Sequence, residues 1–239
     1  MANIVYQYSV LSALMQGIAD GGITAAQLLT HGDHGLGTVS HMDGEIVIVD
    51  GEAYHFTSDH RLRPVQPTDT LPFAMATRFQ PTWSNPVHDL TMDSLSAALA
   101  PLLPSRQNSF LSIRMDGSFR KILFRVVPAQ SVPGEPLGAL AKRQDLTTHV
   151  AVCGTLFGFY SPPFTTGFSV AGFHLHFLSH DRRMGGHVLS FDAEEGELKA
   201  AVANQYQVEF PQSESFHQEP IRAFVETEIH QAEGTSGSD

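Results

Sequence analysis

The sequence predicts an α+β fold: a strand-rich, two-lobed mixed sheet or barrel-like arrangement with a few short helices. Apolar residues at helical spacing lie mainly near the N-terminus. After them, β-branched and aromatic runs alternate with Asp-Gly and Pro/Gly steps, as in successive strands and turns. The 239 residues suffice for one large domain or for two small ones that share a core. We expect an N-terminal α/β lobe over residues 1–130 and a C-terminal strand-rich, metal-binding lobe over 131–239.

Two helices are predicted first. The segment 6–22 carries Val10, Leu11, Leu14 and Ile18 at helical spacing and ends at Gly21-Gly22, a typical C-terminal stop. A second short helix, residues 23–32, ends at Gly32. A third helix is expected much later, over 94–104, where Pro104 ends it.

Strands are predicted for most of the remainder. Residues 35–56 form a meander with turns at Asp43-Gly44 and Asp50-Gly51. Residues 109–130 are expected to form a hairpin that turns at Asp116-Gly117. Further strands are expected over 72–83, 149–160, 170–179, 187–193 and 197–204, and the small polar tail 233–239 is expected to be frayed.

Charge and composition exclude several classes of protein. Acidic residues outnumber basic ones by 25 to 14, which gives a formal net charge of −11. Such a chain is repelled by phosphate backbones and anionic lipid, so we expect no nucleic-acid or membrane partner. The single cysteine, Cys153, excludes an intramolecular disulfide and a thiolate-rich zinc site. With no secretory signal and no apolar run of membrane-spanning length, the chain is expected to be cytoplasmic.

The stretch GFHLHFLSHDRRMGGH, residues 172–187, is the strongest candidate site. On a strand, His174 and His176 point to the same face, and a connection through 179–186 brings His187 beside them. Three imidazoles can then converge at the Zn–N distance of roughly 2.0–2.1 Å. A His-x-His pair alone is weak evidence, but the third histidine, the two glycines and the apolar backing favour a metal site. His180 lies in the predicted turn, and we expect it to be solvated.

Three other polar residues are candidates for a functional site. Glu45 and Glu52 each follow an Asp-Gly turn, so the ordinary interpretation leaves both exposed. Arg125 lies between apolar residues on a half-buried strand, where it either extends to solvent or turns inward toward an anion. The glycine-spaced loop 32–37 is not a dinucleotide-binding fingerprint, and the G-x-S-x-G and H-E-x-x-H motifs are absent.

With these residues in view, the segment GFHLHFLSHDRRMGGHVLSF resembles the metal-binding signature of the α-acetolactate decarboxylase family. Residues 35–56 resemble the N-terminal strand-turn region of that family, and residues 124–137 resemble its central arginine segment. The histidine segment is specific, and the other two occur in the right order. The chain departs from the family pattern at Gly134-Glu135, where an aromatic is expected, and at His60, where glycine is frequent.

The resemblance implies a function and a set of site residues. Zinc is bound by His174, His176 and His187, and acts as a Lewis acid in the decarboxylation of 2-acetolactate to (R)-acetoin. The pocket arginine of the family matches Arg125, and its two acidic residues match Glu45 and Glu233. Loss of CO₂ from acetolactate leaves an enediolate, and both carboxyl groups are candidates for delivering a proton to it. The family also implies a two-lobed fold assembled as a homodimer.

Two alternatives remain open at this stage. One is a cupin-like metal-dependent oxygenase, although such a motif places a glutamate shortly after the second histidine, and Leu178, Ser179, His180 and Asp181 follow here. The other is a non-catalytic zinc-binding module, whose metal would be closed by a fourth protein ligand.

Overall fold

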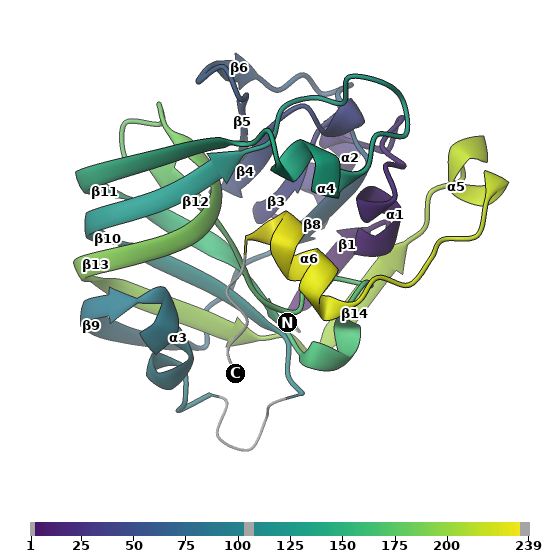
Figure 1. The fold of residues 1–239 in the computed structure, drawn as a ribbon. Coiled ribbons are helices and arrows are strands. Elements are labelled where there is room, and N and C mark those ends of the chain that lie inside the picture. The colour runs from purple at the N-terminus through teal and green to yellow at the C-terminus, as the bar shows by residue number, and fades with distance from the viewer. Residues whose placement is uncertain (1–2, 103–107, 235–239) are drawn as a thin grey trace.

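The computed structural model describes residues 3–102 and 108–234, and it confirms the strand-rich α+β class (Figure 1). Two large sheets carry most of the chain, and short helices pack on them and between them. The helices and minor elements are α1 (Leu11–Met15), β2 (Ile23–Thr24), α2 (Ala25–His31), η1 (Ser40–Met42), β7 (Thr70–Leu71), α3 (Met92–Ala98), α4 (Leu137–Ala141), η2 (Pro163–Thr165), α5 (Glu214–Gln218) and α6 (Glu226–Glu233).

The first sheet has seven strands in the order β14-β1-β8-β3-β4-β5-β6. Neighbouring strands are antiparallel except β1 and β14, which are parallel. Its members are β1 (Ile4–Tyr8), β3 (His34–Thr38), β4 (Glu45–Val49), β5 (Glu52–Phe56), β6 (Leu62–Pro64), β8 (Phe73–Thr77) and β14 (Gln205–Glu209). The β3, β4 and β8 strands are buried throughout, as expected for the centre of a covered sheet.

The second sheet has five strands and closes on itself. Its order is β10-β11-β12-β13-β9, and β10 also pairs with β13, so that β10 to β13 form a ring. The strands are β9 (Trp83–Thr91), β10 (Leu111–Val126), β11 (Asp145–Ser161), β12 (Gly172–Ser179) and β13 (Gly185–Val202). Phenylalanines and aliphatic side chains fill the interior of the ring. This is the barrel-like part of the predicted fold.

The predicted hairpin at Asp116-Gly117 is wrong, because β10 runs straight through these residues as one strand. A tight two-residue turn requires positive φ, which neither residue has. Gly117 lies instead between Gly154 of β11 and Gly196 of β13. A Cβ on Gly117 would lie 2.4 Å from the Glu195 carbonyl oxygen, so the glycine here allows close passage of strands and not a turn. By contrast, Asp50 and Gly51 have φ of 55° and 82°, as the predicted turn requires.

Other predicted boundaries also change. The segment 6–22 is not one helix: its first residues belong to β1, and the helix is limited to Leu11–Met15. Pairing of β1 with both β8 and β14 overrides the helical spacing. The strands predicted over 187–193 and 197–204 are parts of the single strand β13. The helix predicted over 94–104 ends at Ala98, and its last two positions lie outside the described residues. Of the tail expected to be frayed, Glu233 is instead the last residue of α6 and is buried by packing against the site, whereas 235–239 lie outside the described residues.

Each of the two sheets contains strands from both sides of residue 130. Strands β9 and β10 come from the first part of the chain but belong to the five-stranded sheet, whereas β14 comes from the last part and extends the seven-stranded sheet. The lobe boundary at residue 130 therefore stays a prediction. Between the sheets, α1, α4 and α6 contribute to one apolar core with β3, β4, β8, β11 and β12.

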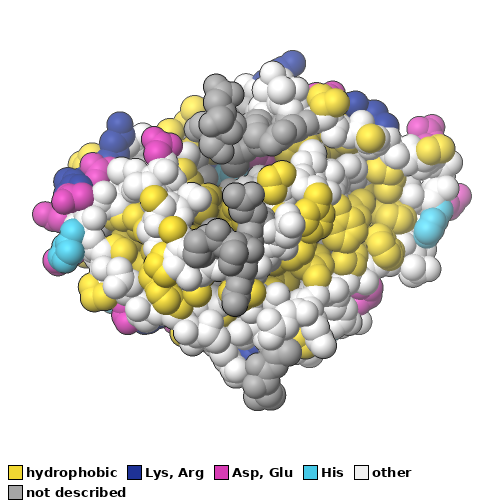
Figure 2. All heavy atoms as spheres, turned by 90° about the horizontal axis from the view of Figure 1, so that it is seen from below, with side chains coloured by type: hydrophobic (Ala, Val, Ile, Leu, Met, Phe, Trp, Pro, Cys, Tyr) yellow, Lys and Arg dark blue, Asp and Glu magenta, His cyan; other side chains and the backbone are white. Residues whose placement is uncertain are grey.

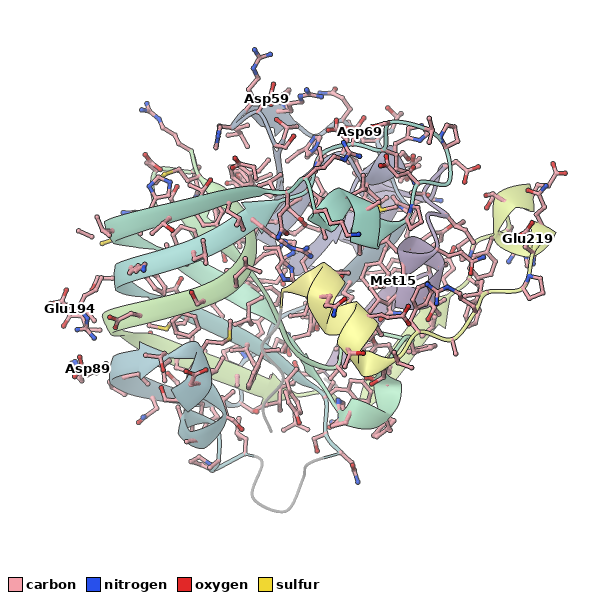
Figure 3. The ribbon with its side chains drawn as sticks, in the orientation of Figure 1. Met15, Asp59, Asp69, Asp89, Glu194 and Glu219 are labelled. Carbon is pink, nitrogen blue, oxygen red and sulfur yellow. The ribbon has the colours of Figure 1, made fainter. Side chains whose placement is uncertain are left out.

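The acidic surplus lies on the surface. In Figure 3 the labelled side chains Asp59, Asp69, Asp89, Glu194 and Glu219 lie at the periphery of the molecule, whereas Met15 lies inside, close to α6. Figure 2 shows the underside, where hydrophobic side chains gather in the middle of the face and charged ones lie mostly toward its rim. Among the described helices, none combines the length and apolar character that a membrane span needs.

Candidate functional site

Three histidines converge where β12 and β13 meet. His174 and His176 are two residues apart on β12, and His187 pairs directly with His176 across the β12–β13 ladder. One ring nitrogen from each lies within 4.8 Å of the others, and all three side chains are buried. A Cβ on Gly186 would lie 2.6 Å from the Arg125 carbonyl oxygen, so glycine at this position lets β13 approach β10 beside the cluster. His180 is exposed, as predicted.

Main-chain carbonyls orient two of the three rings. His176 Nδ1 lies 2.8 Å from the Ile46 oxygen, and His187 Nε2 lies 2.9 Å from the Glu233 oxygen. A carbonyl oxygen only accepts, so each of these nitrogens donates, and Nε2 of His176 and Nδ1 of His187 keep free lone pairs. Such outer hydrogen bonds fix the tautomer of metal-binding histidines in many proteins. In the described part of the chain, the buried His174 Nδ1 has no hydrogen-bond partner.

The environment keeps the three imidazoles neutral. Burial, reinforced by Arg125, lowers the pKa of His176 to about 3, although its bond to Ile46 opposes the shift. Burial likewise holds the pKa values of His174 and His187 well below the usual range, helped by Arg125 and the neighbouring imidazoles. Neutral imidazole is the form that binds metal. These three side chains therefore fit a divalent ion in protonation state, tautomer and spacing.

Two buried carboxyl groups lie beside the histidines. Glu45, at the start of β4, is 6% exposed, and its Oε2 lies 3.6 Å from His176 Nε2. Glu233, at the end of α6, is 4% exposed, and its Oε2 lies 3.7 Å from His187 Nδ1. The exposed-turn interpretation of Glu45 is thus wrong, whereas it holds for Glu52. The tight turn predicted at Asp43-Gly44 is wrong, because β3 and β4 are joined by residues 39–44, which include η1, and Asp43 has a φ of −74°. This connection and the first residue of β4 place Glu45 under the second sheet.

Burial also sets the protonation of these carboxyl groups. Desolvation raises the pKa of Glu45 to about 8, against the opposing charge of Arg125 and with a contribution from Glu233. Burial raises the pKa of Glu233 as well, because desolvation outweighs its ion pair with Arg125. A carboxyl group whose pKa is raised toward neutrality can act as a general acid at physiological pH.

Arg125 is turned inward, which decides between the two interpretations of its strand. It is 2% exposed, and its Nη2 donates to Glu233 Oε2 at 2.8 Å. Its Nη1 donates to the Ala232 carbonyl oxygen and to Gln144 Oε1, the latter at 3.1 Å. Its Nε is buried without a hydrogen-bond partner among the residues that the structure describes. Three of the five N–H groups of the guanidinium are thus used, and the Nε–H is among the donors that remain free at the site.

A small cavity of about 30 Å³ separates these groups from an apolar wall. Glu45, Arg125, His174, His176 and Glu233 line its polar side. The apolar side is formed by Leu11 and Leu14 of α1 together with Met42, Phe73, Val127 and Leu137. A wider groove of about 730 Å³ lies elsewhere, against Arg114, Asp116 and His180, and it includes none of the six predicted residues.

All six predicted residues thus lie in one place, although they come from β4, β10, β12, β13 and α6. Sequence reasoning missed Thr38, which lines the cavity and donates a 2.7 Å hydrogen bond to the Gly44 carbonyl oxygen next to Glu45. It also missed Gln144. Neither residue lies in a motif, since each is placed only by the packing of its loop or strand against the site.

Comparison with known proteins gives one consistent family. A family model described as alpha-acetolactate decarboxylase matches residues 5–223. That range includes Glu45, Arg125 and the three histidines, and it ends before Glu233. Over 233 residues the chain is 37% identical to a protein of Methylococcus capsulatus called alpha-acetolactate decarboxylase, covering 96% of this chain and 88% of that protein.

Further relatives agree. The chain is 34% identical over 215 residues to the alpha-acetolactate decarboxylase of Bacillus licheniformis, covering 90% of this chain and 85% of that one. The crystal structure of alpha-acetolactate decarboxylase from Bacillus subtilis strain 168 superposes with a TM-score of 0.92 at 31% sequence identity. That alignment covers 97% of this chain and 100% of the other, so the whole described fold is shared.

Proposed function

Because the chain belongs to the α-acetolactate decarboxylase family, we propose that it converts 2-acetolactate to (R)-acetoin and CO₂ with a zinc ion at its three histidines. The family makes the chain a carboxy-lyase. Family membership therefore favours the decarboxylase over the two alternatives that the sequence left open, the cupin-like oxygenase and the non-catalytic zinc-binding module. The observation that carries the proposal is the convergence of neutral His174, His176 and His187 beside Arg125 and two buried carboxyl groups.

Zinc is proposed because of the ligand set. Buried neutral imidazoles without any thiolate suit zinc, and its catalytic sites commonly combine three protein ligands with an open position. When bound, such an ion supplies Lewis-acid stabilisation of the negative charge that develops on the ketone oxygen. His176 and His187 are held for this role by their hydrogen bonds to Ile46 and Glu233.

The reaction requires an electron acceptor, an anchor for the carboxylate and a proton. Acetolactate is a β-keto acid, so the bond between its carboxylate and C2 can break while the electron pair moves toward the ketone. This leaves CO₂ and an enediolate, which takes up a proton at C2 to give acetoin. Among the described residues that line the cavity, Arg125 is the one buried cation, and we assign it to the carboxylate.

The two buried carboxyl groups are assigned to proton delivery and to orientation of the substrate. Glu45 lines the cavity beside His176, and its carboxyl group can hold a proton and deliver it to C2. Glu233, at the end of α6, lines the same polar side of the cavity and can orient the substrate hydroxyl. The apolar wall of Leu11 and Leu14 excludes water, which strengthens the interactions of the charged groups.

We also propose that the protein acts as a homodimer in the cytoplasm. The dimer is implied by the family resemblance, and the formal charge of −11 agrees with the absence of nucleic-acid and membrane partners. Light scattering of the purified protein should give about twice the chain mass of 26.1 kDa. A mass equal to one chain at micromolar concentration would contradict the dimer.

The central test uses racemic acetolactate. Purified protein should release CO₂ and form chirally pure (R)-acetoin, and prior removal of metal by a chelator should abolish both. Addition of Zn²⁺ should restore them. Activity that persists in protein shown to be metal-free would disprove the zinc proposal, whereas no activity in zinc-loaded protein would disprove the reaction itself.

A further inference from the structure

Arg125 is held by two separate parts of the chain. Two of its acceptors, the Ala232 carbonyl oxygen and the Glu233 carboxylate, belong to the last turn of α6. The third, Oε1 of Gln144, belongs to the short connection between α4 and β11. Figure 1 shows α4 and α6 side by side between the two sheets, so both parts reach the same arginine.

The small size of the cavity shows why it matters that two separate parts of the chain hold Arg125. A volume of about 30 Å³ holds roughly one water molecule, which is far too small for acetolactate. A wall must therefore move before substrate binds. The α6 helix is the wall that closes the cavity from the C-terminal side, through Glu233. Displacement of α6 would therefore separate Arg125 from Ala232 and Glu233 together.

Gln144 is anchored differently. It immediately precedes β11, which is paired with β10 along its whole length, and Arg125 itself is in register with Leu146. Gln144 is thus tied to Arg125 through the β10–β11 ladder, whereas Ala232 and Glu233 reach Arg125 from α6. Gln144 is not among the residues that line the cavity, so it reaches the reaction only through the arginine.

We propose that Gln144 is a positioning residue that keeps the Arg125 guanidinium aimed at the substrate carboxylate while α6 is displaced; this rests on the proposed function. A guanidinium only donates hydrogen bonds, so the amide oxygen of Gln144 must face it. The amide is neutral and fixes the guanidinium without cancelling its charge. Glu233, by contrast, competes with a substrate carboxylate for the same cation.

Two substitutions separate geometry from charge. Gln144→Leu removes the acceptor at similar volume, and we expect kcat/KM to fall about tenfold, with a higher KM and a lower kcat. Gln144→Glu keeps an acceptor but adds a negative charge, so kcat should stay within about twofold of wild type while KM rises several-fold. Wild-type kinetics in Gln144→Leu, or equal losses of kcat in both variants, would overturn the proposal.

A double substitution tests whether Gln144 acts through Arg125. In an Arg125→Lys background, Gln144→Leu should reduce kcat/KM by less than about twofold, because the group that it positions is already gone. A merely structural glutamine would give the same tenfold loss in both backgrounds. Additive losses would therefore contradict the positioning role.

A matched control and a spectroscopic readout complete the test. Gln130 Nε2 donates to the Gly17 and Glu135 carbonyl oxygens at 2.9 Å, so Gln130→Leu should lower the melting temperature without changing kcat/KM. The Arg125 Nε–H resonance, identified by its loss in Arg125→Lys, should shift or broaden in Gln144→Leu. This readout does not depend on turnover. An unchanged resonance overturns the positioning role, whereas a shifted one in a protein inactive on acetolactate overturns only the proposed reaction.

Discussion

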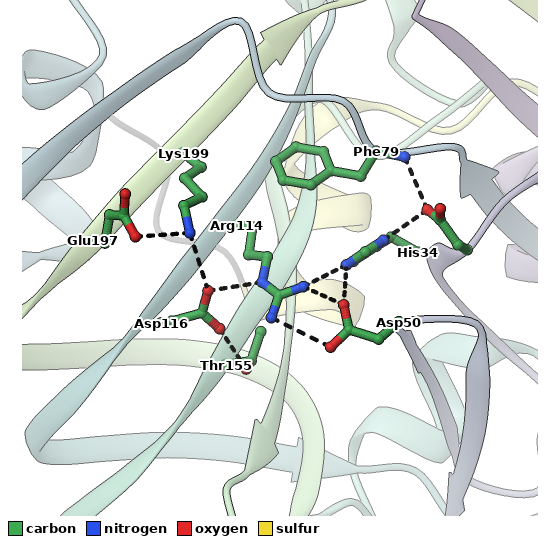
Figure 4. A network of polar contacts seen from close by, with 9 residues as sticks. His34, Asp50, Phe79, Arg114, Asp116, Thr155, Glu197 and Lys199 are labelled. Carbon is green, nitrogen blue, oxygen red and sulfur yellow. Dashed lines mark hydrogen bonds and ion pairs between the residues drawn. The ribbon is translucent and has the colours of Figure 1, made fainter.

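Two polar clusters join the two large sheets, and they differ in how completely their polar atoms are paired. One is the histidine site. The other, which we call the Arg114 network, links the seven-stranded sheet to the five-stranded sheet (Figure 4). Its members are Asp33, His34, Asp50, Arg114, Asp116, Thr155, Glu197 and Lys199.

In the Arg114 network each charge meets a partner. Arg114 donates to Asp50 Oδ1 at 2.6 Å, to His34 Nε2 at 2.7 Å and to Asp116 Oδ2 at 2.8 Å. Because Arg114 only donates, His34 Nε2 accepts, and its Nδ1 donates to Asp33 Oδ1 at 2.8 Å. Thr155 donates to the other oxygen of Asp116. The carboxylates are partly exposed, so desolvation is modest.

At the histidine site the opposite holds. The groups are almost fully buried, yet His174 Nδ1 and Arg125 Nε lack partners among the described residues. Native structures rarely leave buried polar atoms unpaired, and those exceptions cluster where a ligand or ion binds. The comparison teaches that a fully paired cluster stabilises the fold, whereas a buried and incompletely paired one is arranged for binding.

Replacing a histidine should give the largest effect and the sharpest contrast with the Arg114 network. In His176→Ala, bound metal should fall from about one ion per chain to nearly none, and decarboxylase activity should become undetectable. Metal is measured by elemental analysis and activity by acetoin release. His34→Ala, in the network, should retain both. Normal decarboxylation by metal-free His176→Ala would break the comparison.

Truncation tests the C-terminal wall of the site. Deletion from Gln231 onward removes Glu233 and the Ala232 carbonyl, and with them two partners of Arg125. The protein should stay folded, because the buried Ile229 and Phe224 remain, and it should keep its metal. Turnover should fall roughly a thousandfold, since both water exclusion and a carboxyl group are lost. Deletion of residues 235–239 serves as the control and should leave turnover unchanged.

Glu45→Gln removes the proposed proton donor and keeps the size of the side chain. We expect kcat to fall several hundredfold, a typical contribution of a general acid, with metal content unchanged. Glu52→Gln is the matched control, because Glu52 also follows an Asp-Gly step but is exposed. If kcat were equally unaffected in Glu45→Gln and Glu52→Gln, Glu45 would not be the proton donor.

Arg125→Lys tests the carboxylate anchor. A lysine supplies a point charge but not a planar pair of donors, so kcat/KM should fall about a hundredfold, or ~3 kcal/mol. Arg120→Lys is the control on the same strand: Arg120 is exposed and pairs with Asp89 and Asp192, and its replacement should leave kinetics unchanged. Near wild-type kinetics in Arg125→Lys would show that this arginine is only structural.

The Arg114 network should affect stability and not catalysis. Arg114→Met should lower the free energy of unfolding by about 1–3 kcal/mol while kcat/KM stays within about twofold of wild type. Thermal unfolding and steady-state kinetics measure the two effects. A tenfold loss of activity at unchanged metal content would show that the network belongs to the site.

The pH dependence of that stability has a defined sign. Hydrogen bonds from Arg114 lower the pKa of Asp50. Burial pushes the pKa of Asp33 upward, but hydrogen bonds from His34 and Phe79 outweigh it and leave the value lowered. Lowered carboxyl pKa values contribute stability above about pH 4, and this contribution is lost as the pH falls through the folded-state values. The difference in melting temperature between wild type and Asp50→Asn should therefore shrink below about pH 4.

The sequence determined the parts of this protein that depend on local pattern. Alternation along 172–179 placed His174 and His176 on one face, and Gly186, just before His187, allowed β13 to pass close to Arg125. The turn at Asp50-Gly51 followed from the same local rules, because Asp and Gly tolerate positive φ. Resemblance then identified the family, which the comparisons confirmed.

Only the tertiary structure decided which polar residues are buried and what holds them. Glu45 and Glu52 follow the same Asp-Gly motif, yet one lies under the second sheet and the other faces solvent, because burial depends on long-range packing that no local motif encodes. The same holds for Gln144, whose relation to the site is visible only in its hydrogen bond to Arg125. It also holds for Asp116-Gly117, where pairing with β11 and β13 produces a straight strand in place of the predicted turn. The local sequence determined which reactive groups are present, whereas the packing of the two sheets around α6 buried these groups away from water.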